Sequence, residues 1–385
     1  MSERYDVVVV GAGIHGAGVA QAAAAAGYTV LVLEQTAVAA GTSSRSSKLI
    51  HGGLRYLETG RLRLVRESLR ERELLLRLAP TLVRRTAFHI PVYAHSTRSA
   101  LTIRAGLSLY ALLGGLSRET RFARVPAAEW AGLDGLSTEG LKAVYRYHDA
   151  QTDDAELTRA VMRSAVGLGA RLECPATFVA ATASGREVAI DYSVAGTARQ
   201  CVAHVLVNAA GPWVNAVLAA FRPAPRPLPI ELVQGTHIVV GRRLAHGAYY
   251  VEARDRRPVF VLPHGMQTLV GTTETRHIGA PEIAVPRSDE IAYLQQTLTQ
   301  YFPSADARVL AAFAGVRVLL QTNGAYADRA RETALHIDPA LARVLSIYGG
   351  KLTGYRATAQ KIMKRLDVLL PRRTLRAETT RLMLA

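Results

Sequence analysis

The first residues of the chain alternate between apolar runs and small residues. Residues 5–10 are rich in valine and lack polar alternation, which is typical of a central parallel strand covered on both faces. Three glycines and an alanine-rich segment up to Gly27 follow, and residues 28–33 form a second apolar run that ends at Glu34. This order predicts a strand, a helix and a second parallel strand, which together make one β-α-β unit.

Apolar spacing further along the chain predicts more helices and strands. Helices are expected at 61–78, 154–168, 288–301 and 352–370. In the first of these, the arginines would face outward and Leu62, Val65, Leu69 and Leu76 inward. Strand-like segments lie at 171–182, 186–194, 201–207, 236–240, 258–262, 268–272 and 343–348. Residues 90–150 show a mixed pattern in which we cannot order the strands.

The order of these elements predicts two joined domains. Residues 222–229 contain four prolines and indicate a linker that crosses between domains. The β-α-β unit, the mixed region, the strand-rich region and the final strand and helix favour an α/β fold. A doubly wound, Rossmann-like domain would use 1–55, 150–222 and 308–385. An inserted α+β, largely antiparallel cap would use 56–149 and 223–307.

Composition and charge narrow the function. The 385 residues carry a formal net charge of +16, almost all from arginine, which favours anionic partners such as a phosphorylated substrate, a dinucleotide or an acidic membrane face. Nucleic acid is not expected, because aromatic residues make up 6% and are not interleaved with the basic runs. The two cysteines form no C-x-x-C pair, and no His/Cys/Asp cluster has metal spacing.

The sequence also bears on the compartment. Residues 1–4 run directly into a strand, so we expect no signal peptide, and the cysteine usage favours a reducing compartment. The most apolar stretch, 101–116, is interrupted by Arg104 and is too short to cross a bilayer of roughly 30 Å. We therefore expect a cytoplasmic protein, either soluble or peripheral on the inner membrane. Arginine-rich helices at 61–77 and 364–376 could lie on anionic lipid or could simply be exposed helix faces.

The strongest local motif is the string of residues 11–16, Gly-Ala-Gly-Ile-His-Gly. Gly11 would allow a tight turn, Gly13 would let the backbone approach a pyrophosphate, and Gly16 would let the helix pack closely on the strand. Glu34 follows at the end of the second strand, where its carboxylate can accept both ribose hydroxyls. With both strands and the helix in place, the motif predicts dinucleotide binding but does not identify the dinucleotide.

The next segment, 41–57, reads GTSSRSSKLIHGGLRYL. Its hydroxyls and amides could continue a phosphate path, and His51, Arg55 and Tyr56 offer a base, a phosphate fork and a hydrogen-bonding ring. A polar surface loop is the alternative interpretation. This segment resembles the signature of the FAD-dependent, quinone-linked glycerol-3-phosphate dehydrogenases, within the FAD oxidoreductases related to D-amino-acid oxidase and glutathione reductase. Further stretches that resemble the family, in its order, are 208–213, 235–240, 271–273, 315–317 and 349–353.

The resemblance implies a doubly wound FAD-binding domain with a substrate cap, and it implies the residues that bind FAD. Small residues after the strand at Asn208 would pass beside the cofactor, and the helix that begins after Gly350 would point its positive end at the flavin. The implied FAD-binding residues are Gly11, Gly13, Gly16, Glu34, Thr42, Ser43, Ser44, Lys48, Leu49, His51, Gly211, Gly350, Lys351, Leu352 and Thr353.

The resemblance also implies the substrate and the reaction. Hydride would leave C2 of sn-glycerol 3-phosphate for flavin N5 while a base takes the hydroxyl proton, giving dihydroxyacetone phosphate and passing electrons on to a quinone-type acceptor. His51 and His237 are the candidate bases, because imidazole titrates near neutrality. Arg317, inside an apolar run, joins them in the catalytic set, since a charge there needs a partner. The implied substrate-binding residues are Arg55, Tyr56, His237, Arg317, Arg331 and Lys351.

Several positions depart from the family pattern. Glu156 stands where arginine is usual, Gln234 where lysine is common and Glu274 where aspartate is usual. These changes leave a related oxidase or dehydrogenase of an amino acid or hydroxy acid, or a flavin-binding subunit without turnover, as alternatives. The family normally continues into a helical C-terminal domain beyond the end of this sequence. The oligomeric state is open, a homodimer included.

Overall fold

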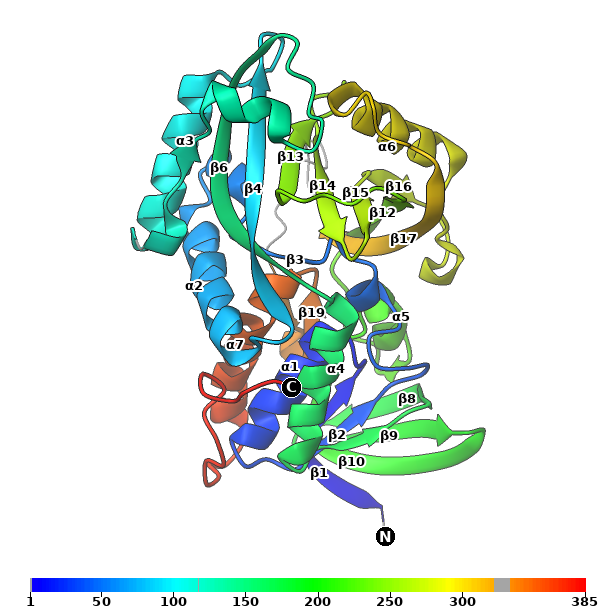
Figure 1. Ribbon diagram of the computed structural model, residues 1–385. Helices are drawn as coiled ribbons and strands as arrows, with labels where there is room; N and C mark the ends of the chain where they lie inside the picture. Colours follow the sequence, from blue (N-terminus) through cyan, green and yellow to red (C-terminus); the bar gives the residue numbers. More distant parts are fainter. Residues whose placement is uncertain (1, 117, 322–332) are drawn as a thin grey trace.

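The computed structural model describes residues 2–116, 118–321 and 333–385, which form two sheets with helices packed on them (Figure 1). The first sheet has a parallel centre in the order β7-β2-β1-β10-β19. Its strands are β1 (Glu3–Val10), β2 (Val30–Leu33), β7 (Arg171–Glu173), β8 (Ala176–Ser184), β9 (Glu187–Val194), β10 (Thr197–Asn208), β11 (Phe221–Arg222), β18 (Ala334–Ile337) and β19 (Val344–Tyr348). The predicted doubly wound domain is therefore present, with strands from the start, middle and end of the chain.

Three helices cover one face of this sheet: α1 (Ile14–Ala25), α4 (Asp154–Gly167) and α7 (Tyr355–Leu369). All but one residue of α1 is buried, and its alanines allow α4 and α7 to approach it on both sides. The Asp153 carboxylate caps α4 by accepting the backbone N–H of Glu156. The β8–β9 hairpin and α5 (Val214–Ala219) pack against apolar residues on the other face.

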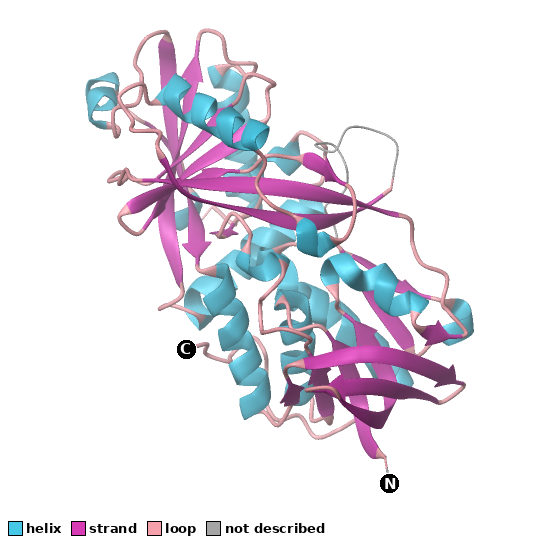
Figure 2. Cartoon of the chain, turned by 90° about the vertical axis from the view of Figure 1, so that its right-hand side faces the viewer, coloured by secondary structure: helices cyan, strands magenta, loops and turns pink. Residues whose placement is uncertain are grey.

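The second sheet is largely antiparallel and forms the cap, which lies beside the C-terminal ends of the parallel strands (Figure 2). Its strands are β3 (Leu49–Ile50), β4 (Val83–Tyr93), β5 (Ala123–Arg124), β6 (Leu141–Thr152), β12 (Ile230–Val240), β13 (Ala248–Glu252), β14 (Pro258–His264), β15 (Gln267–Gly271), β16 (Thr275–His277) and β17 (Val309–Leu320). Helices α2 (Leu62–Leu78) and α3 (Ala100–Leu113) contribute to one apolar cluster, and α6 (Ser288–Tyr301) contributes to another.

Most predicted elements are present within a few residues of their expected bounds. The linker 222–229 runs from β11 of the first sheet to β12 of the second, as predicted. The segment 309–320 differs from the sequence-based domain bounds, because β17 pairs with β12 of the cap. Residues 90–150, which the pattern left unordered, form the end of β4, then α3, β5 and β6, and β4 pairs with β6 along its whole length.

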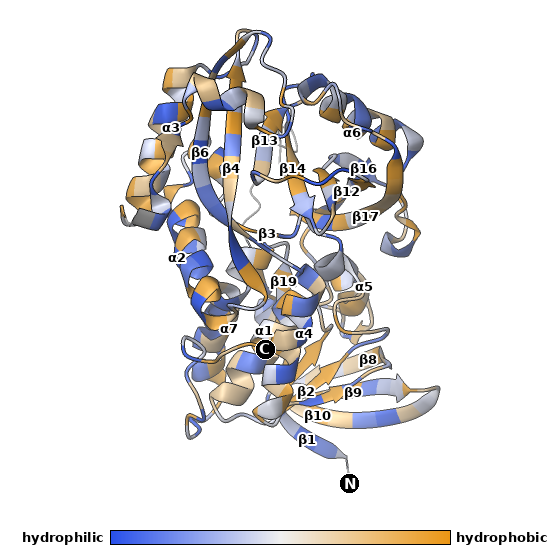
Figure 3. Cartoon of the chain, viewed as in Figure 1, coloured by the Kyte–Doolittle hydropathy of each residue, from blue (hydrophilic) through white to orange (hydrophobic). Residues whose placement is uncertain are grey.

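The helix α2 corrects one expectation about side-chain direction. Hydrophobic and hydrophilic residues follow one another around it (Figure 3), and Arg63, Arg66 and Arg70 are exposed as expected. Arg72, in contrast, is 0% exposed, and Leu62 is 41% exposed rather than buried. A buried guanidinium needs a counter-charge and hydrogen-bond acceptors, because burial removes its hydration.

Candidate functional site

A cavity of about 550 Å³ lies between the two sheets. Its wall contains Glu34 at the end of β2, the turn at Gly11 and Gly13, and the loop from Gly41 to Ser47. From the cap come His237 of β12 and Arg317 of β17, and the Gly349–Thr353 segment completes the wall. Ligands of open α/β sheets bind at the carboxyl ends of the parallel strands, which is where this cavity lies.

The glycine turn at the end of β1 has no room for side chains. Gly11 has a φ of +100°, and a Cβ there would lie 2.7 Å from the backbone oxygen of Ala209. A Cβ on Gly16 would lie 1.9 Å from the backbone oxygen of Gly11, so Gly16 allows α1 to begin close against the strand. Gly11 and Gly13 line the cavity, whereas Gly16 acts through this packing.

Glu34 connects the turn to the end of β2. One carboxylate oxygen accepts the backbone N–H of Ala12 at 2.8 Å, and the other accepts the backbone N–H of Thr36 at 2.9 Å. A carboxylate has about four lone-pair directions, so two acceptor positions are left for hydroxyl donors in the cavity. A vicinal diol carries two such donors.

The loop from Gly41 to Lys48 is held from both sides. The Ser43 hydroxyl accepts the backbone N–H of Ile14 at 2.9 Å, and the Thr42 hydroxyl donates to the backbone oxygen of Val316 on β17 at 2.6 Å. The buried Asp154 accepts from the Ser46 hydroxyl at 2.7 Å and pairs with the Lys48 ammonium. The loop therefore joins the start of α1, the cap strand β17 and the start of α4.

The segment around His51 connects the loop to the C-terminal turn. The Thr353 hydroxyl accepts the backbone N–H of His51 at 3.1 Å, and His51, Leu49 and Thr353 all line the cavity. Gly350 has a φ of +107°, and a Cβ there would lie 2.2 Å from the ring of His15. The Nδ1 atom of His15 is buried and has no hydrogen-bond partner in the described structure, so its hydrogen-bonding capacity is unused.

Positive charge gathers at the cap end of the cavity. Arg317 donates to the backbone oxygen of Thr273 at 3.1 Å and pairs with Glu274 at 3.4 Å. Burial and the nearby Arg55 charge lower the pKa of Arg317 to about 10, so it remains protonated at neutral pH. The Lys351 ammonium lies 3.5 Å from the ring centroid of Tyr56.

The two histidine candidates differ in their surroundings. His237 is 2% exposed, its Nε2 lies 2.9 Å from the Ser47 hydroxyl, and its ring stacks on Phe313 with centroids 5.0 Å apart. Burial lowers the pKa of His237 to about 3, with smaller contributions from Arg317 and Lys48, so its imidazole is neutral. His51 is half-buried, and its ring meets Phe260 edge-on at 6.1 Å.

The structure places the predicted residues as follows. The residues that line the cavity are Gly11, Gly13, Glu34, Thr42, Ser43, Leu49, His51, Tyr56, Gly211, His237, Arg317, Gly350, Lys351, Leu352 and Thr353. Among the described residues, Gly16, Ser44, Lys48 and Arg55 lie outside this lining. Arg55 is nevertheless close enough to influence Arg317, and its guanidinium lies 5.8 Å from the Tyr56 ring centroid. Arg331 falls outside the described residues.

Among the cavity residues to which the sequence pattern gave no role are Trp213, Glu282 and His15. The indole N–H of Trp213, after β10, donates to Glu282 of the cap, and both residues line the cavity. His15 lies within the glycine motif but was not assigned a role. Trp213 is the last residue of the stretch 208–213 that resembles the family, so its position was a usable signal, whereas Glu282 is 69 residues away from Trp213 and had none.

The family departures do not all face the cavity. Glu156 is on the surface and pairs with Arg159. Gln234 is buried, and its amide donates to Glu290 at 2.7 Å and to the backbone oxygen of Val285 at 2.9 Å. The side chain of Glu274 contacts a residue of the cavity wall, because it pairs with Arg317, whereas the side-chain partners of Glu156 and Gln234 given above lie outside the lining. Any effect of these departures on an anionic ligand should therefore come from Glu274.

The described residues contain no group of three or more His, Cys, Asp or Glu residues arranged to hold a metal ion. No helix in the described ranges is long and apolar enough to span a membrane.

Comparisons with known proteins agree with this geometry. Residues 6–360 match the family described as FAD dependent oxidoreductase. The glycerol-3-phosphate dehydrogenase of Pseudomonas aeruginosa is 39% identical over 381 residues, which cover 95% of this chain and 72% of that protein. The D-erythritol 1-phosphate dehydrogenase of Brucella abortus is 36% identical over 385 residues, covering 96% and 75%. The crystal structure of the glycerol-3-phosphate dehydrogenase from Bacillus halodurans complexed with FAD has a TM-score of 0.78 at 24% identity, covering 99% of this chain and 68% of that one.

Proposed function

Because this chain belongs to the FAD-dependent oxidoreductase family, we propose that it oxidises the secondary alcohol of sn-glycerol 3-phosphate to the ketone of dihydroxyacetone phosphate. The observation that carries the proposal is the group of cations at the cap end of the cavity, where Arg317 lies near Arg55 and Lys351 lies against Tyr56. Like charges brought together in a half-buried site favour an anionic ligand, and the curated relatives act on phosphorylated polyols.

The residues of the first domain fit FAD. The glycines at 11 and 13 leave backbone exposed where a pyrophosphate must approach, and a Cβ on Gly13 would come within 3.0 Å of the Ser43 hydroxyl. Glu34 would accept the ribose hydroxyls, and the Thr42–Ser43 loop would extend the phosphate path. His15 also lines the cavity, and its Nδ1 has no hydrogen-bond partner in the described structure. Bound FAD supplies the acceptor for the hydride that leaves the substrate.

The cations orient the substrate. Arginine binds phosphate oxygens through two parallel N–H groups, and the contacts of Arg317 with Thr273 and Glu274 hold its plane in place. The phosphate would lie between Arg317, Arg55 and Lys351, and this directs the C2 carbon toward the first domain. Glu274 takes part of the Arg317 charge, so it would limit how tightly the phosphate is held.

The proton of the C2 hydroxyl needs an acceptor. The pKa of His237 is about 3, so its imidazole holds a proton weakly at neutral pH and is a poor general base. His237, together with the Ser47 hydroxyl that contacts its Nε2, can still position the C2 hydroxyl of the substrate. His51 is half-buried on the cavity wall, so we assign it the role of proton acceptor. The substrate would leave as the ketone with its hydroxyl proton on His51, and bound FAD would supply the acceptor for the two electrons removed.

The proposal also covers the electron acceptor and the binding of the protein to a membrane surface. We expect the electrons to pass on to a quinone-type acceptor at the cytoplasmic face of the inner membrane. On α2, Arg63, Arg66 and Arg70 are exposed, and Leu62 among them is 41% exposed, so this helix supplies both charge and apolar area for an anionic membrane surface. Flotation with anionic but not with neutral vesicles is the expected result, and equal flotation with both would contradict it. A homodimer stays a prediction from the sequence.

The function is tested by mixing the FAD-loaded protein anaerobically with candidate substrates and following the visible absorbance of the flavin. Glycerol 3-phosphate should bleach it, whereas glycerol, which lacks the phosphate, should not. Faster bleaching by D-erythritol 1-phosphate or by glycine would overturn the substrate assignment. Bleaching by none of them would indicate a flavin-binding protein without turnover.

The role of Arg317 has a matched control on the same segment. Arg317→Ala should lower kcat/KM for glycerol 3-phosphate by about 100-fold, since two charge-assisted hydrogen bonds are lost. Arg308→Ala removes an exposed arginine from the start of the same region and should change kcat/KM by less than about twofold. Equal effects of the two substitutions would rule out a specific phosphate contact at Arg317.

A further inference from the structure

A chain of buried polar contacts leads away from the cavity and ends on the peptide that follows His51. The backbone N–H of Gly52 donates to the Tyr110 hydroxyl at 2.8 Å, and this hydroxyl donates to both carboxylate oxygens of Asp149, at 2.9 and 3.0 Å. Asp149 in turn pairs with Arg72. Tyr110, Asp149 and Arg72 are 2%, 1% and 0% exposed, so this is a fully buried network across α3, β6 and α2.

The outer end of the network is fixed by further contacts. Arg72 also donates to the backbone oxygen of His148 at 2.9 Å and to Glu73 at 2.8 Å. Glu73 accepts from Arg85 of β4 at 2.9 Å, which extends the network to the surface. Each hydrogen-bonding atom of the Arg72 guanidinium therefore has a nearby acceptor, as a buried cation requires.

The direction of the hydrogen bonds is set by the charges. Burial raises the pKa of Tyr110 well above its ordinary value of 10, and the Asp149 charge adds to the rise, so the phenol keeps its proton. Its single proton is directed to the carboxylate, which leaves the phenol oxygen as an acceptor for the Gly52 N–H. A phenylalanine at 110 would remove both contacts while keeping the ring.

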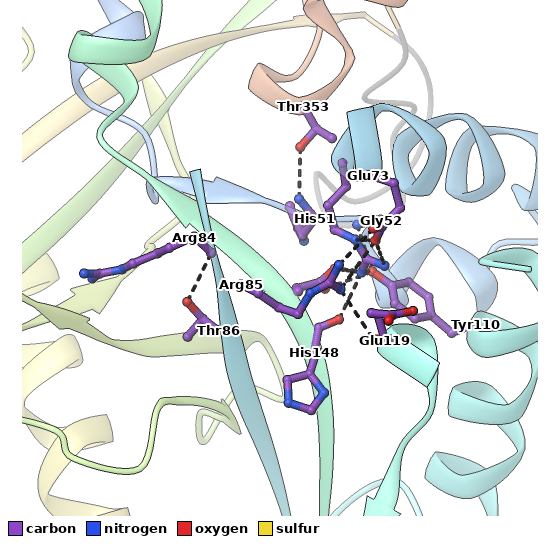
Figure 4. Close-up of polar contacts among 12 residues, drawn as sticks. His51, Gly52, Glu73, Arg84, Arg85, Thr86, Tyr110, Glu119, His148 and Thr353 are labelled. Atoms are coloured by element: carbon purple, nitrogen blue, oxygen red, sulfur yellow. Dashed lines mark hydrogen bonds and ion pairs between the residues drawn. The ribbon is translucent and has the colours of Figure 1, made fainter. Parts of the chain in front are cut away.

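Both peptides that flank His51 are held by side chains. The hydroxyl of Thr353, in the first domain, accepts the backbone N–H of His51. The hydroxyl of Tyr110, in the cap, accepts the backbone N–H of the next residue, Gly52. Figure 4 shows Thr353 reaching His51 from one direction and Tyr110 reaching Gly52 from another. Gly52 has little freedom, because a Cβ there would lie 2.5 Å from the Tyr110 oxygen and 2.8 Å from Leu69.

We propose that Tyr110, supported by Asp149 and Arg72, is a positioning residue that sets the orientation of His51 toward the substrate. Among the described residues, these three lie outside the cavity lining, so they would act through the Gly52 peptide and not by contact with the substrate. Residues after Gly52 have local support of their own, since Tyr56 N–H donates to the backbone oxygen of Gly53 at 3.0 Å. The effect should therefore fall on His51 more than on the phosphate contacts.

The test compares Tyr110→Phe with Tyr147→Phe in the FAD-loaded protein. Tyr147 is equally buried and its ring meets the Tyr110 ring edge-on at 5.9 Å, so the control removes a hydroxyl from the same cluster. Tyr110→Phe should lower kcat per bound FAD about tenfold while KM for glycerol 3-phosphate changes less than about twofold. Tyr147→Phe should leave both values within about twofold of the starting protein.

A second background tests whether the effect passes through His51. In a His51→Gln protein, Tyr110→Phe should lower kcat by less than about a further twofold, because the group that Tyr110 positions is no longer present. If Tyr110→Phe still lowered kcat by the full tenfold in the His51→Gln protein, the inference would be overturned. So would equal kcat values for Tyr110→Phe and Tyr147→Phe, since that result would assign the network to stability alone.

The kinetic test rests on the proposed function, and hydrogen exchange provides a test that does not. Without substrate, the Gly52 amide of the FAD-loaded Tyr110→Phe protein should exchange about tenfold faster than in the starting protein, and in Tyr147→Phe it should not. If glycerol 3-phosphate failed to reduce the flavin, the proposed function would fail while the exchange result still decided the positioning role. Unchanged Gly52 exchange in Tyr110→Phe would overturn the positioning role itself.

Discussion

Glu290 offers a sharp test of how the cap is held together next to the cavity. Its buried carboxylate accepts four side-chain hydrogen bonds of 2.7 Å, from Thr236, Thr273, Thr275 and Gln234. It thereby connects α6 to β12, to the segment that joins β15 to β16 and to the first residue of β16. Three of the donors are neighbours of cavity residues, since Gln234 and Thr236 flank Gly235 and Thr273 follows Thr272.

The substitution Glu290→Gln keeps the shape and removes the charge. An amide has one acceptor oxygen, so two of the hydroxyl donors would face an NH₂ group, and the other two contacts would lose their charge assistance. Hydrogen bonds to charged groups contribute about 1.5–3 kcal/mol each, and the hydroxyls can turn to recover part of the loss. We expect the free energy of unfolding at pH 7.5 to fall by about 2–4 kcal/mol.

The pH dependence of this loss gives an independent check. Burial opposes ionisation of Glu290, but the hydrogen bonds from Thr236, Thr275, Thr273 and Gln234 outweigh it and hold the pKa of this carboxyl below its ordinary 4.5. A lowered folded-state pKa contributes stability that is fully present above 4.5 and is lost as the pH falls through the folded value. The difference in the free energy of unfolding between the starting protein and Glu290→Gln should therefore become smaller below pH 4.5.

The assay is denaturant unfolding from pH 7.5 to pH 3.5, followed by tryptophan fluorescence, to which Trp130 contributes from the cap. Glu67→Gln is the control, because Glu67 pairs with Lys361 on the surface and its loss should change the free energy of unfolding by less than about 0.5 kcal/mol. The account would be refuted if Glu290→Gln lowered the free energy of unfolding by no more than Glu67→Gln does. It would also be refuted if the decrease caused by Glu290→Gln stayed constant down to pH 3.5.

Two further substitutions address the cofactor site and the family departures. Gly16→Ala places a methyl group 1.9 Å from the backbone oxygen of Gly11, so α1 must shift, and the purified protein should carry less than about a tenth of the FAD of the starting protein, measured by absorbance. Gln234→Lys restores the residue common in the family, and because Gln234 points at the Glu290 carboxylate, kcat/KM for glycerol 3-phosphate should change less than about twofold. A larger change would show that position 234 acts on the substrate.

Local patterns predicted the parts of the fold that local physics determines. The strand before Gly11, the buried helix and the strand before Glu34 are set by neighbours a few residues apart, and the structure confirms them. The sheet to which a strand belongs is not local information. The apolar run 309–320 shows a strand, but its pairing with β12 depends on residues about 80 positions earlier, and the sequence-based bounds placed it in the other domain.

The inward position of Arg72 follows from the helical periodicity of the sequence. Val65, Leu69, Arg72 and Leu76 follow one another at spacings of four, three and four residues, so they share one face of a helix. The same periodicity that placed the leucines inward also placed Arg72 inward, against the general expectation that arginines face water. A cation at such a position implies a buried anion, but only the fold shows that Asp149, 77 residues away, supplies it. A charge on the apolar face of a predicted helix therefore predicts a buried partner of opposite charge, and that partner can connect the helix to the site.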